Sequence, residues 1–155
     1  MFQMKMKMGM ENISMKNMEI GFTCSSFDLF HAGHVSMLNE SKRFCDYLIV
    51  GIQIDPSLER PDKNKPIQTL IERQLQVRAC KFVDETIVYE TEDDLVTLLQ
   101  TLPIDIRFVG EEYYKKDFTG KSTRHRDGYE IFYNSRDHNY SSSELRRRIE
   151  ESNEG

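Results

Sequence analysis

The chain has 155 residues, the size of one domain with room for a single sizeable core. Its formal net charge of -5 disfavours general nucleic-acid binding, because phosphate backbones attract basic surfaces. No apolar run is long enough to span a bilayer, so we expect no stable membrane insertion.

The N-terminal segment, residues 1–18, holds all of the methionines except Met37, interspersed with Lys and polar residues. It lacks the continuous apolar stretch of a secretory signal. We therefore expect a disordered extension over residues 1–18, one domain over residues 19–151 and a short tail over residues 152–155.

Short apolar runs alternate with amphipathic stretches along the rest of the chain. The apolar runs predict strands at residues 18–24, 46–53, 85–89, 105–110 and 129–133. Helical spacing of apolar residues predicts helices at residues 35–44, 70–82 and 93–102. A serine cap followed by Glu144 predicts a final helix that begins after Tyr140.

This alternation is typical of α/β proteins, and it predicts a doubly wound parallel sheet of five strands with helices on both faces. Ligands bind such sheets at the carboxyl ends of the strands, near the point where the strand order reverses. Two long polar loops, residues 55–66 and 111–128, are expected above that edge and are candidates for substrate contacts.

The segment 25–34 reads SSFDLFHAGH and lies where the first strand should end and the first helix begin. A helix N-terminus binds phosphate through its free N–H groups and its positive dipole end. Imidazoles of His31 and His34 can donate hydrogen bonds to a phosphoryl group as its charge builds during transfer. Gly33 would let the backbone approach the ligand closely.

Other interpretations of this segment remain open. An HxxH pair can bind a metal ion, although no third or fourth ligand accompanies His31 and His34. One of the histidines could simply cap the helix or pack in the core.

The three cysteines, Cys24, Cys45 and Cys80, are odd in number and form no CxxC pair, which favours free thiols in a reducing cytoplasm.

SSFDLFHAGH resembles the HxGH signature of the nucleotidyltransferase superfamily, and the surrounding sequence resembles its glycerol-3-phosphate cytidylyltransferase-like group. The resemblance runs over residues 20–149, nearly the whole chain beyond the extension. Four motifs carry it in the family's order: FDLFHAGH (27–34), ERQLQVRACKFVDE (72–85), RFVGEEY (107–113) and SRDHNYSSSELRRRI (135–149). The resemblance implies a Rossmann-like fold and an enzyme that joins a nucleoside triphosphate to a small phosphorylated acceptor, releasing pyrophosphate.

The resemblance also implies roles for individual residues. Residues that would hold the triphosphate and stabilise the transition state are His31, His34, Lys63, Lys65 and Arg73. Residues that would contact the nucleotide are Ser25, Ser26, Phe27, Asp28, Gly33, Glu111, Arg136, Tyr140, Ser141, Ser142 and Ser143. Mg²⁺ is expected to bridge phosphate oxygens of the nucleotide, with no metal ligand assigned to the protein. A homodimer with KFVDE (81–85) near the contact is also implied.

Two departures from the family pattern leave the substrates open. Ser25-Ser26 stands where the family usually has Gly-Thr, and Gly110-Glu111-Glu112 stands where it has a Gly-Asp-Asp-like string. We expect CTP as the nucleotide, with glycerol 3-phosphate or a similar alcohol or sugar phosphate as the acceptor. The alternatives are an adenylyltransferase that uses ATP on a sugar phosphate or FMN-like acceptor, and a non-catalytic nucleotide-binding protein of the same fold.

Overall fold

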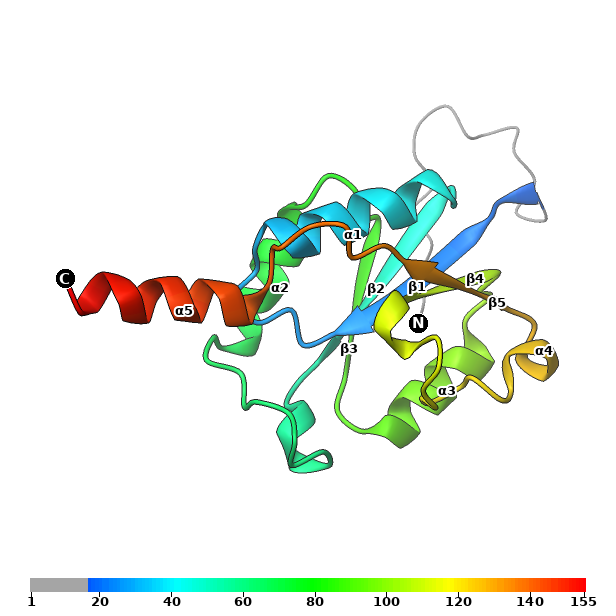
Figure 1. Cartoon of the computed structure of the whole chain (residues 1–155). Helices are drawn as coiled ribbons and strands as arrows, with labels where there is room; N and C mark the ends of the chain where they lie inside the picture. The colour runs from blue at the N-terminus through cyan, green and yellow to red at the C-terminus, as the bar shows by residue number, and fades with distance from the viewer. Residues whose placement is uncertain (1–16) are drawn as a thin grey trace.

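Five parallel strands form one sheet in the order β3-β2-β1-β4-β5 (Figure 1). The computed structural model describes residues 17–155. The strands are β1 (Ile20–Ser25), β2 (Tyr47–Gln53), β3 (Glu85–Tyr89), β4 (Ile106–Gly110) and β5 (Glu130–Asn134). The five-stranded parallel sheet predicted from sequence is confirmed. The strand order reverses between β1 and β4, which places the ligand-binding edge at the carboxyl ends of these two strands.

Between residues 17 and 155, five α-helices connect and flank the strands. They are α1 (Ala32–Arg43), α2 (Leu70–Ala79), α3 (Glu92–Thr101), α4 (Arg124–Asp127) and α5 (Ser142–Asn153). Two short 3₁₀ helices, η2 (Pro56–Leu58) and η3 (Glu111–Tyr113), lie in the long polar loops and were not predicted, nor was α4. Helix α2 ends earlier than predicted because Cys80 already has extended backbone. Helix α5 projects away from the sheet (Figure 1).

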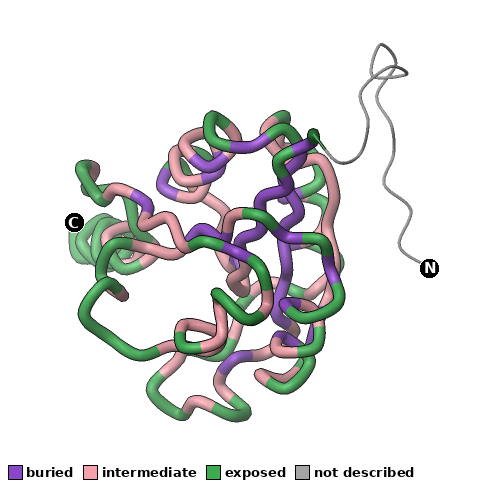
Figure 2. Tube along the Cα trace, turned by 90° about the vertical axis from the view of Figure 1, so that its right-hand side faces the viewer, coloured by how far each residue is buried: buried purple, intermediate pink, exposed green. Residues whose placement is uncertain are grey.

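The core has two halves, one on each face of the sheet. Tyr47 and Ile49 of β2 pack with α3 side chains on one face. Leu48 and Val50 pack with α1 and α2 side chains on the other face. Successive side chains of a strand point to opposite faces, so a strand covered on both sides is buried throughout, and every residue of β2 is buried (Figure 2).

The ends of the domain differ slightly from the predicted boundaries. Met18, predicted both as the last residue of the extension and as the first residue of a strand, is buried in the core on the α3 side of the sheet. Helix α5 extends into the segment predicted as a tail and ends at Asn153. Residues 1–16 of the predicted extension lie outside the described part of the chain. Between residues 17 and 155, no helix is both long enough and apolar enough to cross a membrane.

Candidate active site

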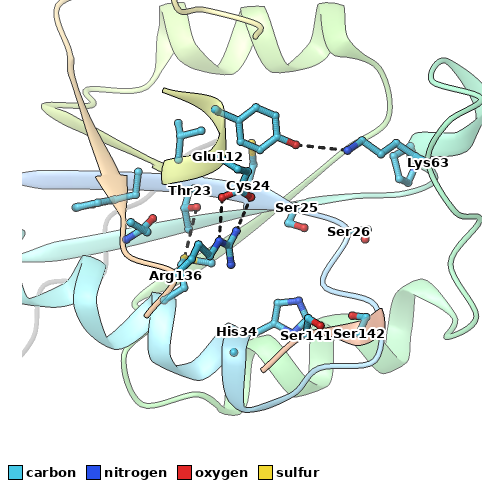
Figure 3. Close-up of a pocket in the computed structure, with 18 of the residues that line it drawn as sticks. Thr23, Cys24, Ser25, Ser26, His34, Lys63, Glu112, Arg136, Ser141 and Ser142 are labelled. Atoms are coloured by element: carbon cyan, nitrogen blue, oxygen red, sulfur yellow. Dashed lines mark hydrogen bonds and ion pairs between the residues drawn. The ribbon is translucent and has the colours of Figure 1, made fainter. Parts of the chain in front are cut away.

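A cleft of about 1180 Å³ opens at the carboxyl ends of β1 and β4, where the strand order reverses (Figure 3). Its volume exceeds that of a pocket for one small ligand and leaves room for a nucleotide together with an acceptor. Residues predicted from sequence that line the cleft are Ser25, Ser26, His31, Gly33, His34, Lys63, Arg136, Tyr140, Ser141, Ser142 and Ser143. Those that do not line it are Phe27, Asp28, Lys65, Arg73 and Glu111.

His31 and His34 are fixed by reciprocal hydrogen bonds at the start of α1. His31 is the N-cap residue, and its Nδ1 accepts a hydrogen bond from the backbone N–H of Gly33 at 3.0 Å. His34 Nδ1 accepts from the backbone N–H of His31 at 3.1 Å. A neutral imidazole whose Nδ1 is an acceptor carries its proton on Nε2. Both rings are therefore set to donate from Nε2, and His31 Nε2 lies 3.2 Å from Ser142 Oγ.

The two imidazoles are held in the neutral form. Burial, together with smaller contributions from the nearby His31 and Arg136, lowers the pKa of His34 to about 3 against a small opposing effect of Asp28. Burial also lowers the pKa of His31, with contributions from His138 and Arg136. A neutral ring keeps the Nδ1 acceptor that caps α1, so the caps and the Nε2–H donors persist together at neutral pH.

The start of α1 lies directly against the start of α5. A Cβ atom on Gly33 would come within 2.5 Å of the Tyr140 carbonyl oxygen, so only glycine allows this approach. Ser141 caps α5, and its Oγ accepts a hydrogen bond from the Glu144 backbone N–H at 3.1 Å. The positive dipole ends of two helices thus face one cleft, an arrangement suited to a polyanion such as a triphosphate.

Arg136 and Glu112 form a bidentate ion pair at the centre of the cleft (Figure 3). The N···O distances are 3.0 Å and 2.8 Å. This pair raises the pKa of Arg136. Burial alone would raise the pKa of Glu112, but its bonds with Arg136 outweigh burial and lower it, so both groups stay ionised. The pair holds the Arg136 guanidinium beside the predicted triphosphate position.

Of the two glutamates that follow β4, Glu112 lines the cleft and the predicted Glu111 does not. Glu111 Oε1 accepts a hydrogen bond from the Arg136 backbone N–H at 2.9 Å, so this carboxylate supports the backbone of the loop after β5. Both glutamates lie in η3, where adjacent side chains point in different directions. The sequence could not distinguish them because the short helix itself was not predicted.

Arg73 is buried, with only 2% of its surface exposed, and does not line the cleft. Its Nη1 donates to the carbonyl oxygens of Ser26 and Gln53 at 2.9 and 2.7 Å, and its Nη2 donates to Ile54 at 2.7 Å. These contacts direct the guanidinium at backbone carbonyl groups, and Arg73 thereby ties together the chain segments that follow β1 and β2. The phosphate contact that the resemblance implied for Arg73 stays a prediction.

The loop between β1 and α1 is fastened by Asp28. Its two carboxylate oxygens accept hydrogen bonds from the backbone N–H groups of Ile67 and Gln68, each at 2.9 Å. The flanking residues Phe27 and Leu29 have φ angles of 53° and 51°, a left-handed conformation that is uncommon for residues other than glycine. Phe27 is fully buried. Asp28 and Phe27 therefore shape the loop that presents His31, and neither lines the cleft.

The loop after β2 supplies one of the two predicted lysines to the cleft. Lys63 lines it (Figure 3), and its Nζ lies 3.4 Å from the Tyr113 hydroxyl. Lys65 does not line the cleft. Arg60 from the same loop also lines the cleft and was missed. The loop sequence DPSLERPDKNKP contained the signal, because Arg60 is a third cation beside the two lysines.

The cleft extends over the sheet edge to the face covered by α3, where it forms what we call the α3-side lobe. This lobe is lined by Gln53, Arg60, Glu92, Arg107, Phe118 and Thr119. The sequence did not single out Arg107. A charged residue within the otherwise apolar run DIRFVG was the available signal, since a buried strand rarely carries an arginine without a specific role.

Comparison with known proteins supports the resemblance seen in the sequence. A family model described as cytidylyltransferase-like matches residues 22–148. The chain is 34% identical over 108 residues to bifunctional protein HldE of Helicobacter hepaticus, over 69% of this chain and 22% of that protein. It is 42% identical over 76 residues to ethanolamine-phosphate cytidylyltransferase of Arabidopsis thaliana, over 46% of this chain and 18% of that protein.

A solved structure shows the same architecture. The lipopolysaccharide core biosynthesis protein of Thermoplasma volcanium matches with a TM-score of 0.63 and 25% identity, over 76% of this chain and 97% of that one. This chain spans about a fifth of the length of the curated relatives that it matches, for example 22% of the Helicobacter protein and 18% of the Arabidopsis protein.

Proposed function

Because the chain belongs to the cytidylyltransferase-like family, we propose that it transfers a nucleoside monophosphate from a nucleoside triphosphate to the phosphate group of a small acceptor. The observation that carries this proposal is the meeting of two helix N-termini, with the Nε2–H donors of His31 and His34, at one cleft. This arrangement suits a triphosphate whose charge is redistributed during transfer.

The proposed chemistry is an in-line displacement. An oxygen of the acceptor phosphate attacks the α-phosphorus, a new phosphorus–oxygen bond forms, and the bond to the leaving pyrophosphate breaks. The Nε2–H groups of His31 and His34 donate to phosphoryl oxygens as negative charge builds on them. Arg136 and Lys63 neutralise charge on the phosphates, and no covalent enzyme intermediate is required.

Mg²⁺ is expected to accompany the triphosphate. Residues 17–155 contain no group of three or more His, Cys, Asp or Glu side chains placed to hold a metal ion. Mg²⁺ commonly keeps several waters and binds through substrate phosphates with few protein ligands, so the nucleotide phosphates would supply most of its contacts in the site. When bound, the ion would neutralise charge on the phosphate oxygens.

We propose CTP as the nucleotide, supported by the family match and by the similarity to a protein named ethanolamine-phosphate cytidylyltransferase. ATP is the alternative nucleotide. The alternative function is a non-catalytic nucleotide-binding protein. The test is pyrophosphate release in the presence of Mg²⁺, with CTP and ATP each tried against a panel of phosphomonoesters. Release that depends on one nucleotide and one acceptor supports the enzyme. Binding of nucleotide without release for every acceptor supports the non-catalytic alternative.

We also propose that the protein is a homodimer that pairs through α2. Ile67, Ile71 and Leu75 recur every four residues in and just before this helix, and they are 63, 69 and 64% exposed. The neighbouring segment 81–85 was expected near the contact, but the Asp84 side chain is 2% exposed and pairs with Lys42 inside the protomer.

Light scattering after size exclusion tests this dimer. The variants Ile71→Glu and Leu75→Glu should run as monomers. Ile149→Glu, which changes an exposed apolar residue on α5, should leave the wild-type mass unchanged. A wild-type protein with the mass of a single chain would contradict the proposed dimer.

A further inference from the structure

The α3-side lobe lies opposite the predicted triphosphate site. His31, His34 and the start of α5 lie on the α1 side of the sheet edge, whereas Glu92 belongs to α3 on the other face. In an in-line displacement the attacking oxygen and the leaving group lie on opposite sides of the reacting phosphorus. With pyrophosphate leaving toward α1 and α5, the acceptor must enter from the α3-side lobe.

The polar groups of the lobe form one connected hydrogen-bond chain. Arg60 Nη2 donates to Gln53 Oε1 at 2.9 Å and pairs with Glu92 Oε1 at 3.3 Å. Thr119 Oγ1 donates to the other oxygen of Glu92 at 2.9 Å. The lobe therefore places hydrogen-bond donors and acceptors close together. Ligand hydroxyl groups suit such a lining, because each hydroxyl both donates and accepts.

Arg107 places a buried positive charge at the floor of this lobe. The residue is 5% exposed, and none of the ion pairs formed between residues 17 and 155 includes it. Its Nη1 donates to the Thr119 carbonyl oxygen, and its Nε has no hydrogen-bond partner among the described residues. A buried cation without a carboxylate partner favours electron-rich ligand groups and disfavours a second cation nearby.

The rings of Phe118 in the lobe and of Tyr113 beside it are already covered by the protein's own cations. The Arg107 guanidinium lies 5.2 Å from the centre of the Phe118 ring, and Lys121 Nζ lies 5.5 Å from the same centre. Lys116 Nζ lies 5.8 Å from the centre of the Tyr113 ring. An aromatic cage for a substituted ammonium group needs free ring faces. Asp117 lines the cleft too, but it is exposed, so solvent screens its charge.

From these contacts we propose that the α3-side lobe is the acceptor subsite and takes a hydroxyl-rich phosphomonoester of the polyol or sugar type. Arg107 is its specificity residue and excludes acceptors that carry an ammonium group. This inference rests on the nucleotidyl transfer proposed above. It adds the location of the acceptor and the residue that selects it.

The test compares acceptors that differ in one feature each. Glycerol 3-phosphate and glucose 1-phosphate carry hydroxyls, propyl phosphate has a three-carbon chain without them, and phosphoethanolamine and phosphocholine carry an ammonium group. We expect kcat/KM for a hydroxylated acceptor to exceed that for propyl phosphate by about tenfold or more. The kcat/KM for a hydroxylated acceptor should exceed the kcat/KM for phosphocholine by about a hundredfold. Equal or better turnover of either ammonium acceptor would overturn the inference while leaving the nucleotidyl transfer intact.

Variants assign the effect to the lobe. Arg107→Met should lower kcat/KM for the hydroxylated acceptor by about ten- to a hundredfold, with the KM for nucleotide within about twofold of wild type. Thr119→Val removes a hydroxyl with little change of shape and should lower kcat/KM for the hydroxylated acceptor by about three- to tenfold. This second variant keeps the test valid if Arg107→Met fails to fold. Arg43→Met, an exposed arginine at the end of α1, is the matched control. An unchanged acceptor kcat/KM in both lobe variants would contradict the assignment.

A binding measurement separates failure of this inference from failure of the proposed reaction. Calorimetry with a non-hydrolysable CTP or ATP analogue present reports acceptor binding without turnover. If no acceptor releases pyrophosphate, but glycerol 3-phosphate or glucose 1-phosphate binds the wild type and not Arg107→Met, the reaction fails and the subsite stands. If neither acceptor binds and none is turned over, the inference is overturned.

Discussion

His31 Nε2 and Ser142 Oγ lie 3.2 Å apart although 111 residues separate them in the sequence. The contact joins the first turn of α1 to the first turn of α5. Because the His31 ring also caps α1 through Nδ1, one imidazole links two helix N-termini. The position of the proposed triphosphate site thus depends on the packing of these two helix starts, and several predictions depend on that packing.

Gly33→Ala is expected to lower kcat/KM by about a hundredfold, because small displacements of reacting groups have effects of this size. The new methyl group would lie 2.5 Å from the Tyr140 carbonyl oxygen and 2.8 Å from the His31 ring, so the two helix starts must separate. Val35→Ala, an exposed position on the same helix, is the control. Steady-state pyrophosphate release and thermal unfolding measure the effect, and wild-type kinetics in Gly33→Ala would argue against the close approach.

His34→Ala is expected to reduce turnover by about two to three orders of magnitude, because it removes a hydrogen-bond donor aimed at developing charge. His125→Ala removes an exposed imidazole in α4 and should leave turnover near wild type. Rates measured at saturating nucleotide and acceptor make the comparison. Similar rates for both variants would show that His34 has no part in the transition state.

Acidification should destabilise the protein through His34. Its pKa is about 3 when folded and 6.5 in the unfolded chain, so below pH 6.5 the unfolded state binds a proton that the folded state does not. Stability is then complete above about pH 6.5 and falls as the pH drops toward about 3, by at most about 1.4 kcal/mol per pH unit for this one group.

Urea unfolding at a series of pH values measures this dependence. His34→Gln cannot take up that proton, so its stability should fall less steeply than that of the wild type between pH 6.5 and 4. Parallel curves for the two proteins would contradict the depressed pKa of His34. Because the ring is neutral throughout this range, activity should show no titration of His34 between pH 5 and 8.

Arg73→Met is expected to lower the stability of the fold more than it lowers the affinity for nucleotide. It leaves the carbonyl oxygens of Ser26, Gln53 and Ile54 without their guanidinium donor, and each buried group left unpaired costs about 1–3 kcal/mol. Thermal unfolding should show a large drop in Tm, whereas Arg43→Met should not. A wild-type Tm together with a raised KM for nucleotide would restore Arg73 as a phosphate contact.

The sheet was predictable from sequence because its signal is local. Each strand is a short apolar run, and the first and last residues of β3 were both predicted correctly. The histidine pair was recognisable because its spacing places both rings in one helical turn.

The positions of the Arg73, Glu111 and Arg107 side chains relative to the cleft could not be predicted, because they depend on which way a side chain points after distant segments pack. Arg73 points inward only because α2 lies over the ends of β1 and β2. Glu112 replaces Glu111 at the cleft because the chain turns into η3 directly after β4. Arg107 lies in a strand whose alternate residues face different halves of the core, so the sequence did not show which face its side chain occupies.

The most direct test of the account is ³¹P NMR of the wild-type protein with Mg²⁺, CTP and glycerol 3-phosphate. The account predicts that the signals of CTP and of the phosphomonoester decline together, while a diester of pyrophosphate and free pyrophosphate appear in equal amounts. His34→Ala should slow all four changes equally. Release of pyrophosphate and CMP that does not depend on the acceptor, with the phosphomonoester signal unchanged, would contradict transfer to a phosphate acceptor.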